Sequence, residues 1–387
     1  MKRFPIINSI LFLSVLASAQ CIDFTDLRSS SVVCTYGTFD NPYQYVGIID
    51  DGPSAGSSRH TIHTNTNERD PRTDNQLRTV PNGEFASVRL GNWSVGAQAE
   101  SITYEYTVDD DTNPILVFKY AAVMEDPGHT PSEQPRLTLE ILDENNQLVD
   151  SYCGAFDFIA SQSLGWNVSS EGILWKDWTA VGLDLSAYSG QNIHIRFTTY
   201  DCKKKGHFGY AYLNISCQQK KIKSLTCGRN AMSTFSGPDG FEYKWYTLNG
   251  STKHIVGNSQ SITVPTDETM YYCEVNQTGK PTCSFTLNVK ADPRLPLANF
   301  NYIKKGTCVD TLYLTNMSSV SRDGQLPNSP MEDCDEYIWN LGDGRIVTTK
   351  DISTPIIYEN TGNYKVSLTA KLTNGNCENT FERNIYM

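Results

Sequence analysis

The sequence lacks the short motifs that most readily identify an enzyme. Its 387 residues contain no HExxH, no P-loop and no GxGxxG, so nothing indicates a zinc peptidase, a nucleotide hydrolase or a dinucleotide-dependent oxidoreductase. Segments with helical periodicity are almost absent as well. These two absences together favour an all-β protein that is not an enzyme.

After residue 19 the sequence also lacks any apolar run that approaches the ~20 residues of a membrane span. At the start, two basic residues precede an apolar run and an Ala17-Ser18-Ala19 cleavage site, an order typical of a secretory signal peptide. We therefore predict a signal peptide at residues 1–19 and an exported protein, secreted or at the cell surface. A lipoprotein acylated at Cys21 is the second alternative, because Gln20 stands where such signals have a small residue.

Positive charge is scarce. Lys and Arg number 32 against 43 Asp and Glu, which gives a formal net charge of −11. Removal of the signal, with its two basic residues, makes the mature chain more acidic still, whereas nucleic acid binding needs a basic surface. We predict no nucleic acid partner and no cofactor, with calcium as the one ion to consider.

Short alternating runs separated by Gly, Pro, Asn and Asp fill the first half of the chain, which is the pattern of an all-β sandwich. The clearest run is residues 192–200, in which Ile193, Ile195 and Phe197 alternate with polar residues. One face of this strand is therefore predicted to pack in the core and the other to contact solvent. The other predicted strands are residues 45–49, 85–90, 102–108, 115–124, 136–142, 156–159, 181–185 and 208–215.

Three stretches of this half carry a resemblance to a known family. They are GEFASVRLGNWSVGAQAESITYEYTV at residues 83–108, EDPGHTPSEQPRLTLEIL at residues 125–142, and residues 178–217, which end in HFGYAYLNISC. Together they resemble an N-terminal jelly-roll module, related to MAM and lectin-like sandwiches, of secreted and surface proteins of Bacteroidota. The resemblance implies an extracellular, non-catalytic module at residues 20–217 and does not name a ligand.

Two further modules follow. Residues 223–290 contain Cys227, Trp245 in a strand, and Cys273 preceded two positions earlier by Tyr271, a pattern that resembles bacterial Ig-like spacers. After a Pro-containing linker at residues 291–297, residues 297–387 resemble a PKD domain, whose hallmark appears here as WNLGDG at residues 339–344. The sequence thus predicts three tandem β-sandwiches with boundaries near Lys220 and Pro293.

The acids and histidines of two Gly-containing loops form the main candidate site. If these loops meet at one end of the first sandwich, their side chains would make a metal or sugar-hydroxyl site, but the pattern favours hydrogen bonds to the backbone that fix the shape of the loops. The residues are Glu125, Asp126, His129, Asp201 and His207.

Weaker candidates lie elsewhere in the first module. Trp175 and Trp178 are predicted at strand ends, where they either stack on a sugar or pack at the rim. Residues 52–56 match G-x-S-x-G but no helix follows, so we do not interpret Ser54 as a nucleophile. The acids of residues 109–111 favour a hairpin turn over a calcium loop. The polar residues 52–76 are predicted to be a long functional loop.

Eleven cysteines in an exported chain predict disulfides, with at least one thiol left over. Cys334 is the predicted free thiol, and Cys217 is given no partner. Cys227 pairs with either Cys273 or Cys283, which spacing does not decide. The remaining predicted pairs are Cys21 with Cys34, Cys153 with Cys202, and Cys308 with Cys377.

These observations predict an exported adhesion or binding protein. Its first module binds a glycan or a surface protein, and the other two act as spacers. A secreted hydrolase that acts through the loops of the first module is one alternative, and a purely structural surface or matrix component is another.

Overall fold

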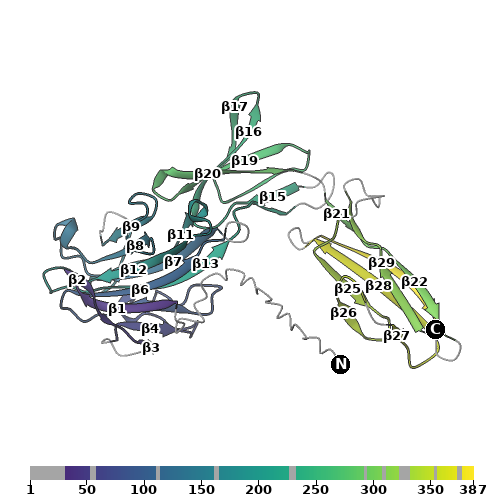
Figure 1. The fold of residues 1–387 in the computed structure, drawn as a ribbon, viewed down its shortest axis with the longest axis horizontal. Helices are drawn as coiled ribbons and strands as arrows, with labels where there is room; N and C mark the ends of the chain where they lie inside the picture. The colour runs from purple at the N-terminus through teal and green to yellow at the C-terminus, as the bar shows by residue number, and fades with distance from the viewer. Residues whose placement is uncertain are drawn as a thin grey trace, which may run out of the picture. The chain divides into compact units, whose positions relative to one another are not determined.

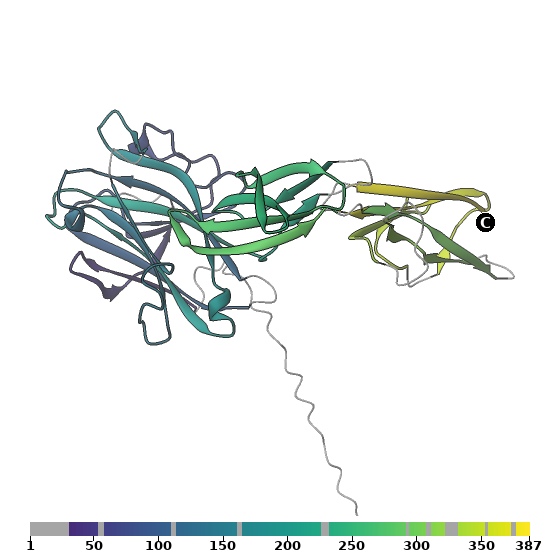
Figure 2. The ribbon, with the colours of Figure 1, turned by 90° about the horizontal axis from the view of Figure 1, so that it is seen from above.

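The computed structural model is almost entirely β, as the sequence predicts. It describes residues 31–52, 58–109, 114–160, 165–225, 232–291, 294–306, 311–321, 332–352, 355–372 and 377–387. Strands make up nearly all of the regular structure in both ribbon views (Figure 1 and Figure 2), and three short 3-10 helices accompany them, η2 (Pro71–Thr73), η3 (Pro131–Glu133) and η5 (Ser186–Tyr188). The chain divides into two compact units, residues 1–219 and 220–387.

The first unit is a sandwich of two sheets. Sheet A has the order β2 (Asn41–Val46), β1 (Val32–Thr38), β6 (Gln98–Thr107), β12 (Asn192–Tyr200), β8 (Arg136–Leu142), β9 (Ala155–Ile159). Sheet B has the order β10 (Asn167–Val168), β11 (Leu174–Asp184), β7 (Ile115–Met124), β13 (Gly209–Gln218), β5 (Ser87–Leu90), β4 (His60–His63), β3 (Ile49–Asp51). Successive strands from β5 to β8 alternate between the two sheets, as in a jelly roll.

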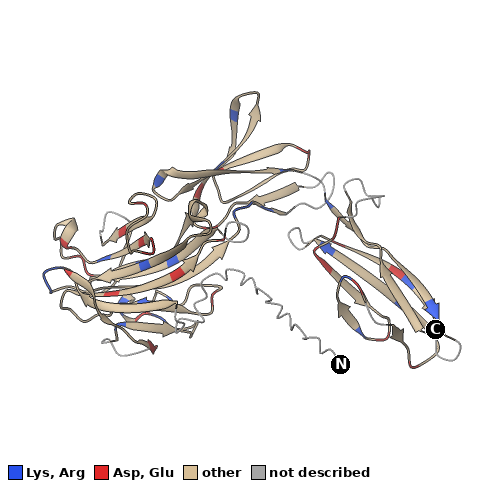
Figure 3. Ribbon diagram, in the orientation of Figure 1, with Lys and Arg blue, Asp and Glu red and all other residues tan. Residues whose placement is uncertain are grey.

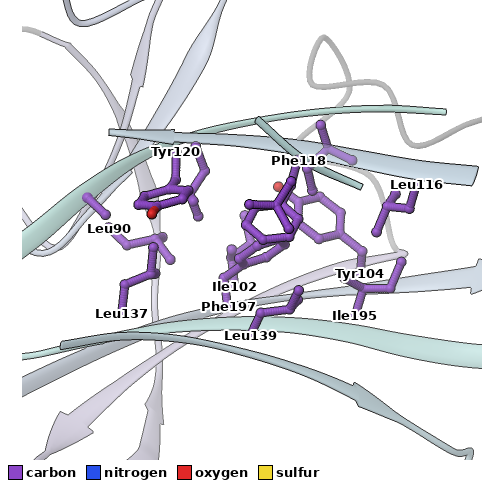
Figure 4. Packing of buried hydrophobic residues seen from close by; sticks show 14 of the residues in the cluster. Leu90, Ile102, Tyr104, Leu116, Phe118, Tyr120, Leu137, Leu139, Ile195 and Phe197 are labelled. Carbon is purple, nitrogen blue, oxygen red and sulfur yellow. The ribbon is translucent and has the colours of Figure 1, made fainter. Parts of the chain in front are cut away.

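The core lies between the sheets because each strand turns alternate side chains inward. On β12 the fully buried Ile193, Ile195 and Phe197 alternate with half-buried polar residues, which confirms the two faces that the sequence predicts. Figure 4 shows the aromatic and aliphatic side chains of the two layers facing one another, and the ring centroids of Phe118 and Phe197 lie 5.4 Å apart. Burying each such side chain stabilises the fold by about 1.5–3 kcal/mol.

Several strands of the first unit depart from the predictions. The predictions do not include β1 or β10, and the predicted strand at residues 45–49 covers only the end of β2 and the first residue of β3. β4 lies inside the polar segment 52–76, where we predicted only loop, and it pairs with β3 in parallel and with β5 antiparallel. β11 begins at Leu174, well before the predicted strand at residues 181–185, so Trp175 and Trp178 lie within a strand.

The second unit contains two further sets of sheets. The first set is β14 (Lys223–Leu225), β15 (Met232–Ser236) and β18 (Ser261–Pro265), with β17 (Thr252–Gly257), β16 (Phe241–Asn249), β19 (Met270–Gln277) and β20 (Lys280–Lys290). Trp245 of β16 is fully buried, and its Nε1 donates to the Ser259 carbonyl at 2.9 Å. The strand-borne Trp of the Ig-like pattern is therefore a core residue.

The second set covers the predicted PKD region. It comprises β21 (Leu295–Leu297) with β24 (Ser319–Ser321), β22 (Phe300–Lys305), β23 (Thr311–Asn316) and β27 (Ile356–Ile357), and β26 (Ile346–Thr348), β25 (Glu336–Asn340), β28 (Asn363–Leu372) and β29 (Cys377–Tyr386). Gly342 and Gly344 both have positive φ in the WNLGDG segment, and the Arg345 side chain holds the pKa of Asp343 below its usual value. The motif is a tight turn after a buried Trp339. The predicted linker 291–297 is partly wrong, because Leu295–Leu297 is a strand.

The cysteines correct several predicted disulfides. Cys153, Cys217, Cys283 and Cys377 are disulfide-bonded, whereas Cys34, Cys202, Cys273 and Cys334 are buried free thiols. The predicted pairings of Cys34, Cys202 and Cys273 are therefore wrong, although Cys334 is the free thiol expected. Cys34 and Cys273 sit on inward faces of their sheets, where burial raises the pKa of each thiol to about 12.

Other predictions lie where the structure gives no description. The signal peptide, Cys21, Cys227, Cys308 and Pro293 lie outside the described residues, as do Ser54 and residues 110–113. Within the described ranges, none of the helices is long and apolar enough to cross a membrane.

Candidate functional site

The outer face of sheet A presents an open row of polar side chains. Strand register places Arg196 of β12 opposite Thr103 of β6 and opposite Glu140 of β8, and His194 opposite Glu105. Lys, Arg, Asp and Glu are interspersed along these strands rather than gathered by sign (Figure 3). This is the solvent-facing side of the strand that the alternating residues 192–200 predict.

A pocket of about 270 Å³ lies on this face. Its lining comes from β1, β2, β6, β12 and the turn after β8, and consists of Ser31, Val33, Thr35, Tyr43, Thr103, Glu105, Asn146, His194 and Arg196. An aromatic ring beside hydroxyl, amide, carboxylate and guanidinium groups is the mixture that recognises a polar ligand with apolar faces.

Arg196 is the centre of the pocket. Its guanidinium lies 4.5 Å from the centre of the Tyr43 ring, in a cation–π geometry. Its Nη2 donates to Asn146 Oδ1 at 2.8 Å and its Nε to Thr103 Oγ1 at 3.3 Å. Asn146 adopts φ 60°, a left-handed conformation that Asn tolerates, and so turns its amide toward β12. The guanidinium is thus held in place before any ligand arrives.

The carboxylate side of the pocket is less constrained. Glu105 is exposed and accepts a hydrogen bond from Asn192 Nδ2 at 2.5 Å. His194 Nδ1 lies 3.3 Å from Asn146 Oδ1. Tyr43 of β2 is 40% exposed, so its ring remains accessible at the pocket. The open face therefore combines fixed polar groups with an accessible aromatic ring.

The outer face of sheet B is covered instead. Residues 64–86, which we call the cover segment, bury Asp70 completely against β13. Asp70 Oδ2 accepts hydrogen bonds from the Tyr210 and Tyr212 hydroxyls at 2.8 and 2.7 Å, and Asp70 Oδ1 accepts one from the Arg72 amide at 2.7 Å. Burial, then the nearby Asp70 charge, raise the pKa of both tyrosines well above the usual value.

The buried network continues from Asp70 to neighbouring charges. Arg89 is 2% exposed and lies 5.1 Å over the Trp93 ring. His63 Nδ1 lies 2.8 Å from Glu68 Oε2, and burial lowers the pKa of His63 despite that carboxylate. Within the polar residues 52–76, the described part thus supplies β4 and the first half of the cover segment, rather than one long loop.

The predicted carboxylates of the main candidate site are largely used by the backbone. Glu125 Oε2 accepts from the Phe208 amide at 3.0 Å, and Asp126 Oδ1 accepts from the Gly128 amide at 3.0 Å. The two oxygens of Asp201 accept from the amides of Gly209 and Gln98. The loops do meet, but these acids fix their shape.

The histidines of those loops meet as well. The ring centroids of His129 and His207 lie 5.5 Å apart, and His207 Nδ1 lies 3.4 Å from Cys202 Sγ. Among the described residues, these three are the group of His, Cys, Asp and Glu side chains whose ligand atoms converge on one point. We did not predict a role for Cys202 here, because the sequence assigned it to a disulfide.

Two buried acids carry raised pKa values of the kind found in acid catalysts. Burial raises the pKa of Asp201 to about 8 and that of Glu100 to about 7, the latter against the opposing charge of Arg59. Glu100 Oε1 lies 2.6 Å from Arg59 Nη1, and the two acids are only 1% and 2% exposed. Because a substrate does not reach either side chain, we interpret both as structural.

The two candidate tryptophans lie in different surroundings. Trp175 is 6% exposed, which leaves no accessible face for a sugar. Trp178 packs against Tyr212 under the cover segment and donates from Nε1 to the Arg78 carbonyl at 2.8 Å. Its edge lines a pocket of about 450 Å³ together with Arg69, Lys119 and Asp177. Of the pair, only Trp178 remains a candidate for ligand contact.

Comparison with known proteins identifies one module. Residues 310–386 match the family model described as a PKD domain. No curated protein matches the chain.

Solved structures give only distant likenesses. They include TmCBM61 in complex with β-1,4-galactotriose (9% identity, TM-score 0.24, 43% of this chain and 90% of that chain). They also include the glycoside hydrolase domain of Endo-D from Streptococcus pneumoniae R6 (13%, 0.20, 54% and 34%) and a β-1,2-glucanase from Parabacteroides distasonis (11%, 0.21, 67% and 36%). The chain thus spans about a third of the last two, and TM-scores this low support no statement about function.

Proposed function

We propose that the protein is an exported, non-catalytic binding protein whose first unit holds an extracellular glycan on the outer face of sheet A. The Ig-like and PKD regions act as spacers. The single observation that carries the proposal is the pocket around Arg196, where the guanidinium is fixed by Tyr43, Asn146 and Thr103 on an uncovered sheet face. The PKD match supports an extracellular setting, because such domains are typical of extracellular proteins.

The chemistry of the pocket suits a sugar. A pyranose offers hydroxyls to guanidinium, amide and carboxylate groups and an apolar C–H face to an aromatic ring, and the pocket contains both kinds of partner. The accessible ring of Tyr43 supplies the apolar contact. Glu105 and Asn146 supply acceptors, while Arg196 supplies donors.

The hydrogen bonds of the acidic residues in the main candidate site favour a non-catalytic role. Glycoside hydrolysis needs two accessible carboxyl groups on opposite sides of the bond. The acids of the main candidate site, led by Glu125 and Asp201, accept backbone amide hydrogen bonds instead. No specific contact favours the hydrolase over the binding protein.

The first experiment is a glycan array probed with residues 20–387, followed by calorimetric titration of each hit. Arg196→Ala should weaken binding at least about tenfold, because it removes the group that organises the pocket. Arg72→Ala is the matched control, since this arginine pairs with Glu171 on the outside of sheet B. The proposal fails if Arg196→Ala binds as well as the unaltered protein.

Two other outcomes would point to the rival functions. Turnover of an array polysaccharide that Glu125→Gln abolishes would favour a hydrolase. If the protein bound no glycan but bound a surface protein, and Arg196→Ala disrupted that binding, the outer face of sheet A would still be the binding site, with a protein as its ligand. If the protein bound neither a glycan nor a surface protein, a purely structural role would be favoured.

A further inference from the structure

The loops at one end of the first unit bring two imidazoles and a thiol together. Cys202 follows β12, His207 precedes β13, and His129 lies in the loop after β7. One ligand atom of each residue lies within 4.8 Å of the others, and the Cys202 Sγ to His207 Nδ1 distance is 3.4 Å. Cys202 and His207 share the loop between β12 and β13, and the fold brings the loop that carries His129 against it.

Backbone hydrogen bonds hold these loops in position. The Cys202 amide donates to the His207 carbonyl at 2.9 Å, and the Lys205 amide donates to the Cys202 carbonyl at 3.1 Å across a turn in which Lys205 has φ 69°. The Glu125 amide donates to the Phe208 carbonyl at 3.1 Å, while Glu125 Oε2 accepts from the Phe208 amide. The loop that carries His129 is therefore anchored to the loop that carries His207.

One buried polar atom of the cluster lacks a hydrogen-bond partner in the described part of the protein. Cys202 is a free thiol with no exposed surface. Among the described residues, His129 Nδ1 is buried and has no hydrogen-bond partner, which is unusual for a buried polar atom. An ion placed between the three side chains would supply the missing partner, which gives a second reason to expect a ligand here.

We propose that His129, Cys202 and His207 form a binding site for a transition metal ion, with Zn²⁺ the best fit. A thiolate and two imidazoles are soft or borderline ligands, which suit zinc rather than calcium. Tetrahedral zinc, with bonds of about 2.3 Å to sulfur and about 2.1 Å to nitrogen, places sulfur and nitrogen about 3.5 Å apart. The Cys202 to His207 distance of 3.4 Å is close to that separation.

The fourth position would be open to water or to a ligand from outside, because the group contains three protein ligands. The positive charge nearby is partly compensated. Lys203 pairs with Asp40 at 2.8 Å and Lys204 with Glu133 at 3.2 Å, so two of the three adjacent lysines are paired with acids. The site is separate from the Arg196 pocket and does not depend on the proposed glycan binding.

Co²⁺ is the probe, because a thiolate bound to tetrahedral Co²⁺ gives a charge-transfer band in the near ultraviolet and intense visible bands. The full chain is stripped with EDTA without reducing its disulfides, and CoCl₂ is then titrated in. We expect both sets of bands to saturate at one equivalent and to disappear when Zn²⁺ is added. Binding should tighten as pH rises, since metal displaces the thiol proton.

Variants assign the ligands. Cys202→Ser should abolish the charge-transfer band, and His129→Gln and His207→Gln should each weaken Co²⁺ binding at least about tenfold, the smallest loss seen even for residues that only support a ligand. Cys334→Ser, which removes another buried free thiol, is the matched control and should bind as the unaltered protein does. Circular dichroism of each variant establishes that it is folded.

Zn²⁺ should also raise the melting temperature of the unaltered protein and not that of His129→Gln, whose side chain is only half-buried. The proposal is overturned if no charge-transfer band forms, or if the band persists in Cys202→Ser. Glycan binding measured in EDTA reports on the Arg196 pocket independently, so the two proposals fail separately.

Discussion

The two outer faces of the first unit carry similar side chains and treat them in opposite ways. Sheet A leaves Arg196 and Glu105 on an uncovered face, with the Tyr43 ring beside them. On sheet B, Arg89 and the Asp70 of the cover segment are buried between the sheet and that segment, among aromatic rings and tyrosine hydroxyls. Charge together with aromatic residues therefore does not by itself mark a binding site in this protein.

The two faces differ in whether other residues of the chain already supply the hydrogen-bond partners of the charged side chains. Asp70 accepts hydrogen bonds from two tyrosine hydroxyls and one backbone amide, which uses its capacity inside the protein. Glu105 has one side-chain donor and remains exposed. Polar side chains that are held in position but remain exposed can bind a ligand, and we locate the candidate glycan site by this property.

The largest expected effect tests the covered face. Asp70→Ala should lower the free energy of unfolding by about 3–5 kcal/mol, because two buried tyrosine hydroxyls lose their acceptor. Glu105→Ala, on the open face, should change it by less than about 0.5 kcal/mol. Urea denaturation of both variants measures the difference. Equal losses would show that the two faces are not distinguished as we describe.

Lowering the pH should reduce the free energy of unfolding through His60 of β4, in sheet B. Burial lowers the pKa of His60 to about 4, whereas the unfolded chain has a histidine pKa of about 6.5. Between these values the unfolded state binds a proton that the folded state does not, so stability falls as pH falls from about 6.5 to about 4. For His60 alone the loss between pH 7 and pH 4.5 is about 2 kcal/mol.

His60→Gln isolates this contribution. Glu100 and Asp201 act with the opposite sign, because their raised pKa values make the folded state gain stability as pH falls. The unaltered protein therefore shows only the sum. The drop in unfolding free energy between about pH 7 and about pH 4.5 should be smaller in His60→Gln by about 2 kcal/mol. An unchanged drop would contradict the assignment.

Aromatic substitutions on the two faces should separate binding from stability. Tyr43→Ala should weaken glycan binding about tenfold, or about 1.4 kcal/mol, with little effect on unfolding. Trp178→Ala should instead cost about 1–2 kcal/mol of stability, because its ring and its hydrogen bond to Arg78 are lost, and should leave affinity within about twofold. Calorimetric titration and urea denaturation of each variant supply both quantities. If Trp178→Ala alone impaired binding, the ligand would lie at the Trp178 pocket instead.

The smallest effect concerns the residue that positions Arg196. Asn146→Gly keeps the backbone at φ 60° without strain and removes the amide, so stability should hold within about 0.5 kcal/mol while affinity falls about threefold. Asn146→Ala removes the same amide but adds about 1 kcal/mol of backbone strain. Similar affinities in the two variants, with different stabilities, would confirm that the side chain and not the turn acts on the ligand.

The sequence predicts those parts of the fold in which alternation alone determines the strand. The bounds of β8 and β12 agree with the predictions, because every second residue is an apolar side chain that must face the core. β7 was also predicted with its observed bounds, because it is an apolar run that is buried on both faces. β4 was missed because its residues are polar and are buried only with distant partners, such as the Ser101 carbonyl 3.0 Å from His60 Nε2.

The candidate site was only half visible for the same reason. The polar face of β12 could be recognised from its own residues, but the ring of Tyr43 and the amide of Asn146 come from other segments. The disulfides failed because nearness in sequence does not determine which face a cysteine occupies, and Cys34 faces the core. The meeting of the loops that carry His129 and His207 was only a condition of the predicted site, and the thiol that lies beside them was assigned to a disulfide.

The network around Asp70 also imposes an order on assembly. Its carboxylate is separated from the hydroxyls of Tyr210 and Tyr212 by 140 and 142 positions along the chain. At a synthesis rate of roughly 5–20 residues per second, about 7–28 seconds pass between the synthesis of Asp70 and that of the two tyrosines that donate to it. Until β13 has been synthesised, the Asp70 carboxylate lacks both tyrosine donors, so the cover segment cannot complete its contacts with sheet B.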